Sequence, residues 1–131
     1  PLSLIEYLDT KNKTICLPMV VNKKQPLIFK PWRPGKKMVI GHYGISVPDN
    51  DQTLIPDLII CPLLAYDSKG MRLGYGGGFY DRTIKYFRKN KQVKYIGLAF
   101  SGQKSYHDLP SEVHDVPLDA VLTETGMDYF Q

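Results

Sequence analysis

The spacing of hydrophobic residues predicts two helices. Leu2, Leu4, Ile5 and Leu8 fall on one helical face, which predicts a helix over residues 2–9. Further along, Tyr80, Ile84 and Phe87 recur at i, i+4 and i+7, with basic residues on the other faces. This second stripe predicts a helix of about ten residues that begins near residue 79.

Short apolar runs between polar segments predict strands at residues 14–20, 27–29, 58–64, 95–100 and 120–123. The run at 58–64 is nearly all apolar, which is typical of a central parallel strand covered on both faces. Residues 32–51 are rich in Gly and Pro and are expected to form short or irregular pieces. The alternation of strands with a helix predicts an α/β fold, a sandwich around a mostly parallel sheet.

Length and composition are consistent with the predicted α/β fold and indicate the number of domains. The chain has 131 residues, with 43% hydrophobic and 23% charged residues, which predicts one globular domain over residues 1–131. No apolar window is long enough to span a membrane and no signal region opens the chain, so a cytoplasmic protein with no membrane association is expected. The sequence does not indicate an oligomeric state.

The two cysteines and the charges give weaker indications. Cys16 and Cys61 each lie in a strand-like run without zinc-site spacing, so we interpret them as buried structural thiols. The net charge of +4 divides into +6 for residues 1–40 and −2 for residues 41–131. This asymmetry fits either a solvated basic face or the attraction of an anionic ligand. No basic-aromatic interleaving is present, so no nucleic acid partner is expected.

Candidate chemistry is concentrated between the apolar run at 58–64 and the predicted second helix. Gly74, Gly76, Gly77 and Gly78 fall within five positions. Backbone N–H groups that lack a neighbouring Cβ can turn toward an anion, and the helix that follows adds the positive end of its dipole. We interpret the segment as a phosphate-binding loop, and the competing interpretation is a tight structural connection.

The loop does not match two common phosphate-binding motifs. A Walker loop needs Gly-Lys-Ser/Thr, and the dinucleotide fingerprint needs Gly or Ala where this chain has Phe79. Arg72 could offer a bidentate guanidinium to phosphate oxygens. Asp81 could stabilise the helix end or hold a metal ion on a phosphate.

The run from Arg72 to Arg82, RLGYGGGFYDR, resembles the signature of the 5-formyltetrahydrofolate cyclo-ligase family, also called methenyltetrahydrofolate synthetase. The resemblance extends over nearly the whole chain. Further matches occur at Leu17-Pro18, Tyr43-Gly44-Ile45, residues 57–62, Gly97 to Gln103, and residues 109–124. It implies a three-layer α/β sandwich with a Rossmann-like sheet, the cyclo-ligase fold.

The resemblance also implies an enzyme that converts 5-formyltetrahydrofolate to 5,10-methenyltetrahydrofolate, with ATP and Mg²⁺ as cofactors and release of ADP and phosphate. Arg72 and Tyr80 would be catalytic, and Asp81 and Asp119 would hold the metal. The implied ATP- and phosphate-binding residues are Arg72, Gly74, Tyr75, Gly76, Gly77, Gly78 and Tyr80. The implied folate-binding residues are Tyr43, Gly76, Gly77, Gly78, Phe79 and Tyr80.

Some of these residues also have a structural interpretation. Tyr43, Phe79 and Tyr80 could simply pack, and Tyr80 shares the apolar stripe of its helix. His114 and Asp115 look like a dyad, but without a nucleophile at a readable position we interpret them as a structural turn.

Members of the family are usually longer, with a preceding helix and strand that contact ATP and folate. The chain resembles their C-terminal two-thirds. Three hypotheses therefore stay open: a cyclo-ligase that lacks its N-terminal portion, a degenerate member that binds nucleotide or folate without turnover, and a non-catalytic interaction module.

Overall fold

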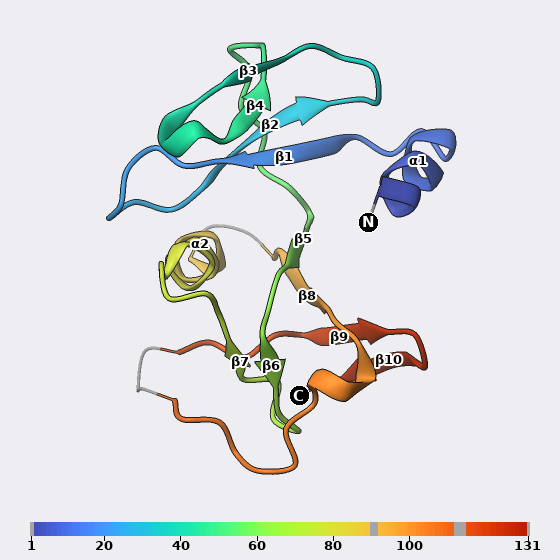
Figure 1. Cartoon of the computed structure of the whole chain (residues 1–131), viewed down its shortest axis with the longest axis vertical. Helices are drawn as coiled ribbons and strands as arrows, with labels where there is room; N and C mark the ends of the chain where they lie inside the picture. The colour runs from blue at the N-terminus through green and yellow to red at the C-terminus, as the bar shows by residue number, and fades with distance from the viewer. Residues whose placement is uncertain (1, 90–91, 112–114, 131) are drawn as a thin grey trace. The chain divides into compact units, whose positions relative to one another are not determined.

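A computed structural model describes residues 2–89, 92–111 and 115–130. The chain forms two compact units, Pro1–Pro56 and Asp57–Gln131, and each is described by itself. Figure 1 shows the elements of both units. The expectation of one domain over residues 1–131 stays a prediction.

The first unit contains one helix and two small antiparallel sheets. Strand β1 pairs with β2, with Ile15 opposite Trp32, and β3 pairs with β4. Pro18 lies inside β1, which is possible because a two-stranded sheet leaves one edge of each strand without a partner. The elements are α1 (Leu2–Thr10), β1 (Ile15–Met19), β2 (Ile28–Trp32), β3 (Met38–Ile40), the 3₁₀ turn η1 (His42–Gly44) and β4 (Ser46–Pro48).

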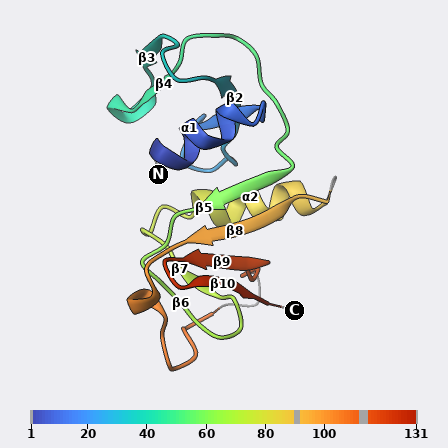
Figure 2. The ribbon, with the colours of Figure 1, turned by 90° about the vertical axis from the view of Figure 1, so that its right-hand side faces the viewer.

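The second unit is built on a four-stranded sheet in the order β10-β9-β8-β5. Strands β5 and β9 both run parallel to β8, and β10 returns antiparallel beside β9, as Figure 2 shows. The predicted α/β fold with a mostly parallel sheet is therefore confirmed. The strands are β5 (Leu58–Cys61), β8 (Lys94–Leu98), β9 (Ala120–Thr123) and β10 (Gly126–Tyr129).

Between β5 and β8 the chain forms a hairpin, then the glycine loop, then a helix. The hairpin strands pair antiparallel, with Tyr66 opposite Arg72. The helix begins and ends where the apolar stripe predicted it. These elements are β6 (Ala65–Tyr66), β7 (Arg72–Leu73) and α2 (Phe79–Arg88), and the short η2 (Ser101–Gln103) follows β8.

The core of the second unit lies between α2 and the sheet. Ile84 of α2, Tyr95 of β8 and Cys61 of β5 are fully buried. The Tyr95 hydroxyl donates to the Ile84 carbonyl at 3.4 Å, which ties the helix to the sheet. The predicted stripe of α2 therefore faces the sheet, with Ile84 and Phe87 buried.

The prediction that residues 58–64 form a central strand covered on both faces is wrong for the described sheet. Strand β5 is the last strand in the order, and its burial alternates. Cys61 and Ile59 are buried, whereas Leu58 and Ile60 are 46% and 38% exposed. An apolar run indicates which residues favour burial, but it does not show how many neighbours a strand has.

The two cysteines differ in burial. Both are free thiols, and Cys61 is buried as predicted. Cys16 in β1 is only partly buried, because the antiparallel pair of β1 and β2 does not enclose it completely.

Candidate active site

The glycine loop occupies residues 74–78 and joins β7 directly to α2. Gly76 and Gly78 have φ values of +95° and +69°, a region that residues with a Cβ rarely adopt. Gly78 is the residue immediately before α2 and has no side chain that could cap the helix. The residue before the helix therefore has a left-handed backbone conformation, which glycine adopts without strain.

Three of the loop glycines are also in close contact with side chains. A Cβ on Gly74 would lie 2.8 Å from Arg72 Nη1, and one on Gly77 would lie 2.9 Å from the Phe79 ring. A Cβ on Gly78 would lie 2.7 Å from Nη1 of Arg82. The absence of side chains lets two arginines and an aromatic ring approach the loop backbone.

The backbone amides of the loop are not used internally. Within the described ranges, no hydrogen bond joins an N–H of residues 74–81 to any acceptor of the chain. The first N–H groups of a helix lack a helical partner and carry partial positive charge. Residues 74–81, the amide row, thus carry consecutive N–H groups without an acceptor among the described residues, and such groups can bind an anion.

Arg72 lies beside this row and is almost completely buried, with 5% of its side chain exposed. Its guanidinium donates to the Pro62 carbonyl at 3.3 Å and to Asp81 Oδ1 at 3.1 Å, and it lies 5.7 Å from the Tyr80 ring centroid. Its Nε is buried and has no partner among the described residues. A buried donor without a partner costs about 1–3 kcal/mol, so a guanidinium held in this way favours an additional acceptor.

The two predicted metal carboxylates lie in different surroundings. Asp81, in the first turn of α2, is half exposed and pairs with Arg72. Asp119 precedes β9, accepts the Tyr95 N–H at 2.8 Å and lies 3.9 Å from Arg88 Nη2. Among the described residues, no hydrogen bond joins the two carboxylates, and no group of three metal-ligating side chains occurs.

Two buried groups beside the loop have raised pKa values. Burial raises the pKa of the Cys61 thiol to about 12; Arg72 lowers it, and Asp81 and Asp119 raise it further. Burial also raises the pKa of the Tyr80 hydroxyl to about 12, with Cys61 adding to the increase and Arg72 opposing it. Both groups therefore stay protonated near neutral pH.

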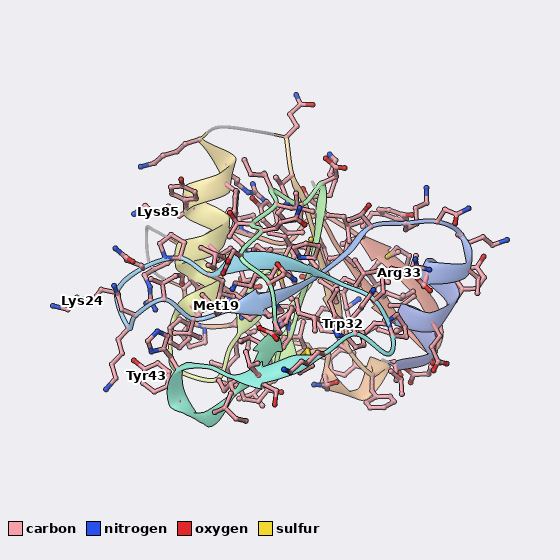
Figure 3. The ribbon with its side chains drawn as sticks, turned by 90° about the horizontal axis from the view of Figure 1, so that it is seen from above. Met19, Lys24, Trp32, Arg33, Tyr43 and Lys85 are labelled. Atoms are coloured by element: carbon pink, nitrogen blue, oxygen red, sulfur yellow. The ribbon has the colours of Figure 1, made fainter. Side chains whose placement is uncertain are left out.

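The aromatic residues predicted to contact folate lie in both units. Phe79 and Tyr80 open α2, next to the glycines, and Tyr75 is exposed within the loop. Tyr43 belongs to the first unit, where it is 58% exposed and has a φ of +59° on the turn η1. Figure 3 shows its ring on this turn, and Lys23 Nζ lies 6.0 Å from the ring centroid.

Two residues of the site were named from the sequence only within matching segments and were given no role. Gln103 donates to the carbonyls of Leu63 and Leu64, both at 3.1 Å, and so ties the segment after β8 to the segment after β5. Arg82 donates to the Gly77 carbonyl at 3.0 Å. Its position four residues after a helix-starting glycine was the available signal, because one helical turn returns the side chain to the loop.

The structural turn expected at His114 and Asp115 lies partly outside the described residues, because His114 is not among them. In the part of the chain that the structure covers, no helix combines the length and the apolar character needed to cross a membrane.

Residues 2–124 match the 5-formyltetrahydrofolate cyclo-ligase family. The chain belongs to this family. A 5-formyltetrahydrofolate cyclo-ligase of Haemophilus influenzae is 40% identical over 126 residues, covering 92% of this chain and 66% of the relative. The cyclo-ligase of Escherichia coli K12 is 36% identical over 126 residues, covering 92% and 68%.

Solved structures of the cyclo-ligase family share the fold. The NMR structure of 5,10-methenyltetrahydrofolate synthetase from Aquifex aeolicus superposes with a TM-score of 0.76 at 28% identity, covering 99% of this chain and 64% of that one. The synthetase from Mycoplasma pneumoniae gives a TM-score of 0.65 at 25% identity, covering 91% and 61%. The chain thus spans about two-thirds of the length of these relatives.

Proposed function

We propose that the chain carries out the conversion of 5-formyltetrahydrofolate to 5,10-methenyltetrahydrofolate, dependent on ATP and Mg²⁺, with release of ADP and phosphate. Its family membership supports the folate chemistry. The observation that carries the ATP part is the row of free amides at residues 74–81, placed between the buried Arg72 and the start of α2.

The loop suits phosphoryl transfer because that chemistry needs placement and charge neutralisation more than a protein nucleophile. In the proposed reaction the formyl oxygen takes the γ-phosphoryl group, the neighbouring folate nitrogen attacks the activated carbon, and phosphate leaves. The amides of Gly74 to Gly78 and the guanidinium of Arg72 bind the phosphate oxygens. Tyr80, whose pKa is raised to about 12, acts as a hydrogen-bond donor and not as a base.

Folate binding is assigned to Tyr43, the loop glycines, Phe79 and Tyr80. A flat pterin packs favourably on exposed aromatic rings, and Tyr43 is 58% exposed, with Lys23 Nζ 6.0 Å from its ring centroid.

Magnesium would neutralise charge on the phosphate oxygens. Asp81 fits this role because its carboxylate is half exposed and next to the amide row. Asp119 fits it less directly, because one oxygen accepts the Tyr95 N–H and the other faces Arg88. Asp81→Asn should therefore reduce the Mg²⁺ dependence of ATP affinity more than Asp119→Asn.

The test combines turnover with binding. The purified chain is mixed with Mg-ATP and 5-formyltetrahydrofolate, the methenyl product is followed by absorbance, and each ligand is titrated separately by calorimetry. Gly77→Asp places a negative charge within the amide row and should abolish ATP binding. Gly102→Asp is the matched control, because a Cβ at Gly102 meets nothing within 4 Å.

A second candidate function is binding of nucleotide or folate without turnover. It is favoured by the surroundings of Asp119, whose carboxylate accepts the Tyr95 N–H and faces Arg88 and therefore fits a metal ion less directly. Binding of both ligands with no methenyl product would support this second candidate. Failure to bind either ligand would contradict both and leave a non-catalytic interaction module.

A further inference from the structure

Arg82 makes three contacts that converge on the glycine loop. Its Nη2 donates to the Gly77 carbonyl at 3.0 Å, and its Cζ lies 5.0 Å from the centroid of the Phe79 ring. Its Nη1 fills the space where a Cβ of Gly78 would stand. The guanidinium therefore lies across the peptide that joins the last two loop glycines.

This contact has a consequence for the direction of a backbone donor. The carbonyl and the N–H of a trans peptide point in opposite directions, and the described chain contains no cis peptide. When Arg82 holds the Gly77 carbonyl, the N–H of Gly78 must point away from Arg82. That N–H belongs to the row of donors without an internal acceptor.

The Nε of Arg82 is buried and has no partner among the residues that the structure describes. A guanidinium that served only to stabilise the helix would gain more by bonding all of its buried donors, because an unmade buried hydrogen bond costs free energy. The Arg82 side chain thus bonds the Gly77 carbonyl through Nη2 while its Nε has no hydrogen-bond partner among the described residues.

We propose that Arg82 is a positioning residue that fixes the Gly77–Gly78 peptide so that the Gly78 N–H faces the phosphate chain of the bound nucleotide. The inference rests on the proposed function for the identity of the ligand, a nucleoside triphosphate. Arg82 itself does not need to touch the phosphates. Its effect is transmitted through one peptide plane.

Arg88 provides a matched control on the same helix. It donates to a backbone carbonyl, that of Pro117, at 2.9 Å, and it lies 5.0 Å from the Tyr95 ring centroid. Arg82 and Arg88 therefore both donate to a backbone carbonyl and lie near an aromatic ring. Arg88 also lies 3.9 Å from Asp119, and only Arg82 holds the loop. A general effect of losing an arginine from α2 would be the same for both.

The experiment uses the full chain and two probes, Mg-ATP and inorganic tripolyphosphate with Mg²⁺, which has no nucleoside. Arg82→Gln should weaken the affinity for tripolyphosphate at least tenfold, whereas Arg88→Gln should change it less than twofold. Arg82→Lys should recover part of the affinity, because an ammonium group can donate to the Gly77 carbonyl but cannot lie flat on Phe79. Thermal unfolding of each variant shows whether it is folded.

A second measurement reports on the peptide directly. In ¹⁵N spectra, tripolyphosphate should shift the Gly78 amide of the unaltered chain and leave it unshifted in Arg82→Gln. Equal affinity of the unaltered chain and Arg82→Gln overturns the inference, as does equal loss in Arg88→Gln or no binding of tripolyphosphate at all. Loss of affinity specific to Arg82→Gln, without any methenyl product from the unaltered chain, supports the inference and contradicts only the proposed turnover.

Discussion

Gly78 is required both for its positive φ and for the space that a Cβ would take from Arg82. Mutations can separate these two requirements. Gly78→Ala places a Cβ in the left-handed region and 2.7 Å from Arg82 Nη1. We expect a loss of about 1–2 kcal/mol in the free energy of unfolding. We also expect ATP affinity to fall about tenfold or more, because the displaced Arg82 no longer holds the Gly77 carbonyl. A tenfold loss of affinity corresponds to about 1.4 kcal/mol of binding free energy.

The control for this prediction is Gly35→Ala. Gly35 also has a positive φ, +87°, but a Cβ there meets nothing within 4 Å. It should lower the free energy of unfolding by a similar amount in urea titrations and leave the calorimetric ATP affinity unchanged. A Gly78→Ala variant that binds ATP normally would show that the position matters only for stability.

The two thiols should differ in reactivity. Burial raises the pKa of Cys61 to about 12, so at pH 8 only about one molecule in ten thousand carries the thiolate. Because the thiolate is the nucleophile, a disulfide reagent should label Cys16 much faster than Cys61 in the folded chain. In Cys16→Ser the remaining thiol should react slowly until denaturant is added, and rapid labelling of folded Cys16→Ser would contradict the assigned burial.

At this scale the sequence was a good guide to which residues matter but not to their partners. The glycines, Arg72 and Asp81 could be named because their residue types are unusual in combination. Their contacts could not, because the Arg72–Pro62 hydrogen bond joins two segments whose approach depends on the whole hairpin. The contacts of the Asp119 carboxylate likewise could not be predicted, since its partners Tyr95 and Arg88 are far from it in sequence.

At the scale of elements, Glu124 joins the turn after β9 to the start of η2. Its carboxylate accepts the Ser101 N–H at 2.8 Å and the Ser101 hydroxyl at 2.6 Å. These hydrogen bonds lower the pKa of Glu124 below its ordinary value of 4.5. The stabilisation is therefore present above the unfolded-state pKa and is lost as the pH falls through the lowered folded-state pKa.

Glu124→Gln should accordingly be less stable than the unaltered chain at neutral pH. The difference should shrink between about pH 5 and pH 3. Urea unfolding at several pH values measures it, and Ser101→Ala, which removes one of the two hydrogen bonds, should show a smaller effect. A difference that does not change with pH would assign the role of Glu124 to packing.

The sequence predicted elements well where a period or a run was clear. The stripe of Tyr80, Ile84 and Phe87 gave the bounds of α2 because amphipathic burial repeats every turn. Strand β10, Gly126–Tyr129, was not predicted, because its residues are mixed and mostly exposed. Its pairing with β9 comes from chain reversal at Thr123–Gly126 and not from a hydrophobic run.

At the scale of the whole molecule, Gly97 allows close packing against the sheet of the second unit because it has no side chain. A Cβ on Gly97 of β8 would lie 2.7 Å from Leu63, 2.9 Å from Leu118 and 3.1 Å from Val121. Gly97→Ala should lower the free energy of unfolding by about 1–3 kcal/mol, because it overpacks a closed core. Gly102→Ala, which meets no neighbour, should have little effect in the same urea titration.

The fold class followed from the alternation of strands and helix, whereas the strand order did not. An apolar run such as that of β5 records a tendency to be buried, and only the assembled sheet shows that the strand lies at an edge. The predicted contact of Tyr43 with folate stays a prediction for a related reason. Tyr43 and the glycine loop belong to different units, and the sequence pattern predicts the elements of each unit but no distance between Tyr43 and the loop.

Arg72 and Asp81 neutralise each other beside the amide row, and Arg82 leaves one net positive charge there. A guanidinium already matched by a carboxylate adds little net attraction, so Arg82 and the partial charges on the amides and the helix end provide most of the attraction for an anion. A bare polyanion would also meet repulsion from Asp81. The loop should therefore bind a phosphate chain that arrives with a cation more tightly than the same chain without one, a preference that comes from charge balance and not from shape.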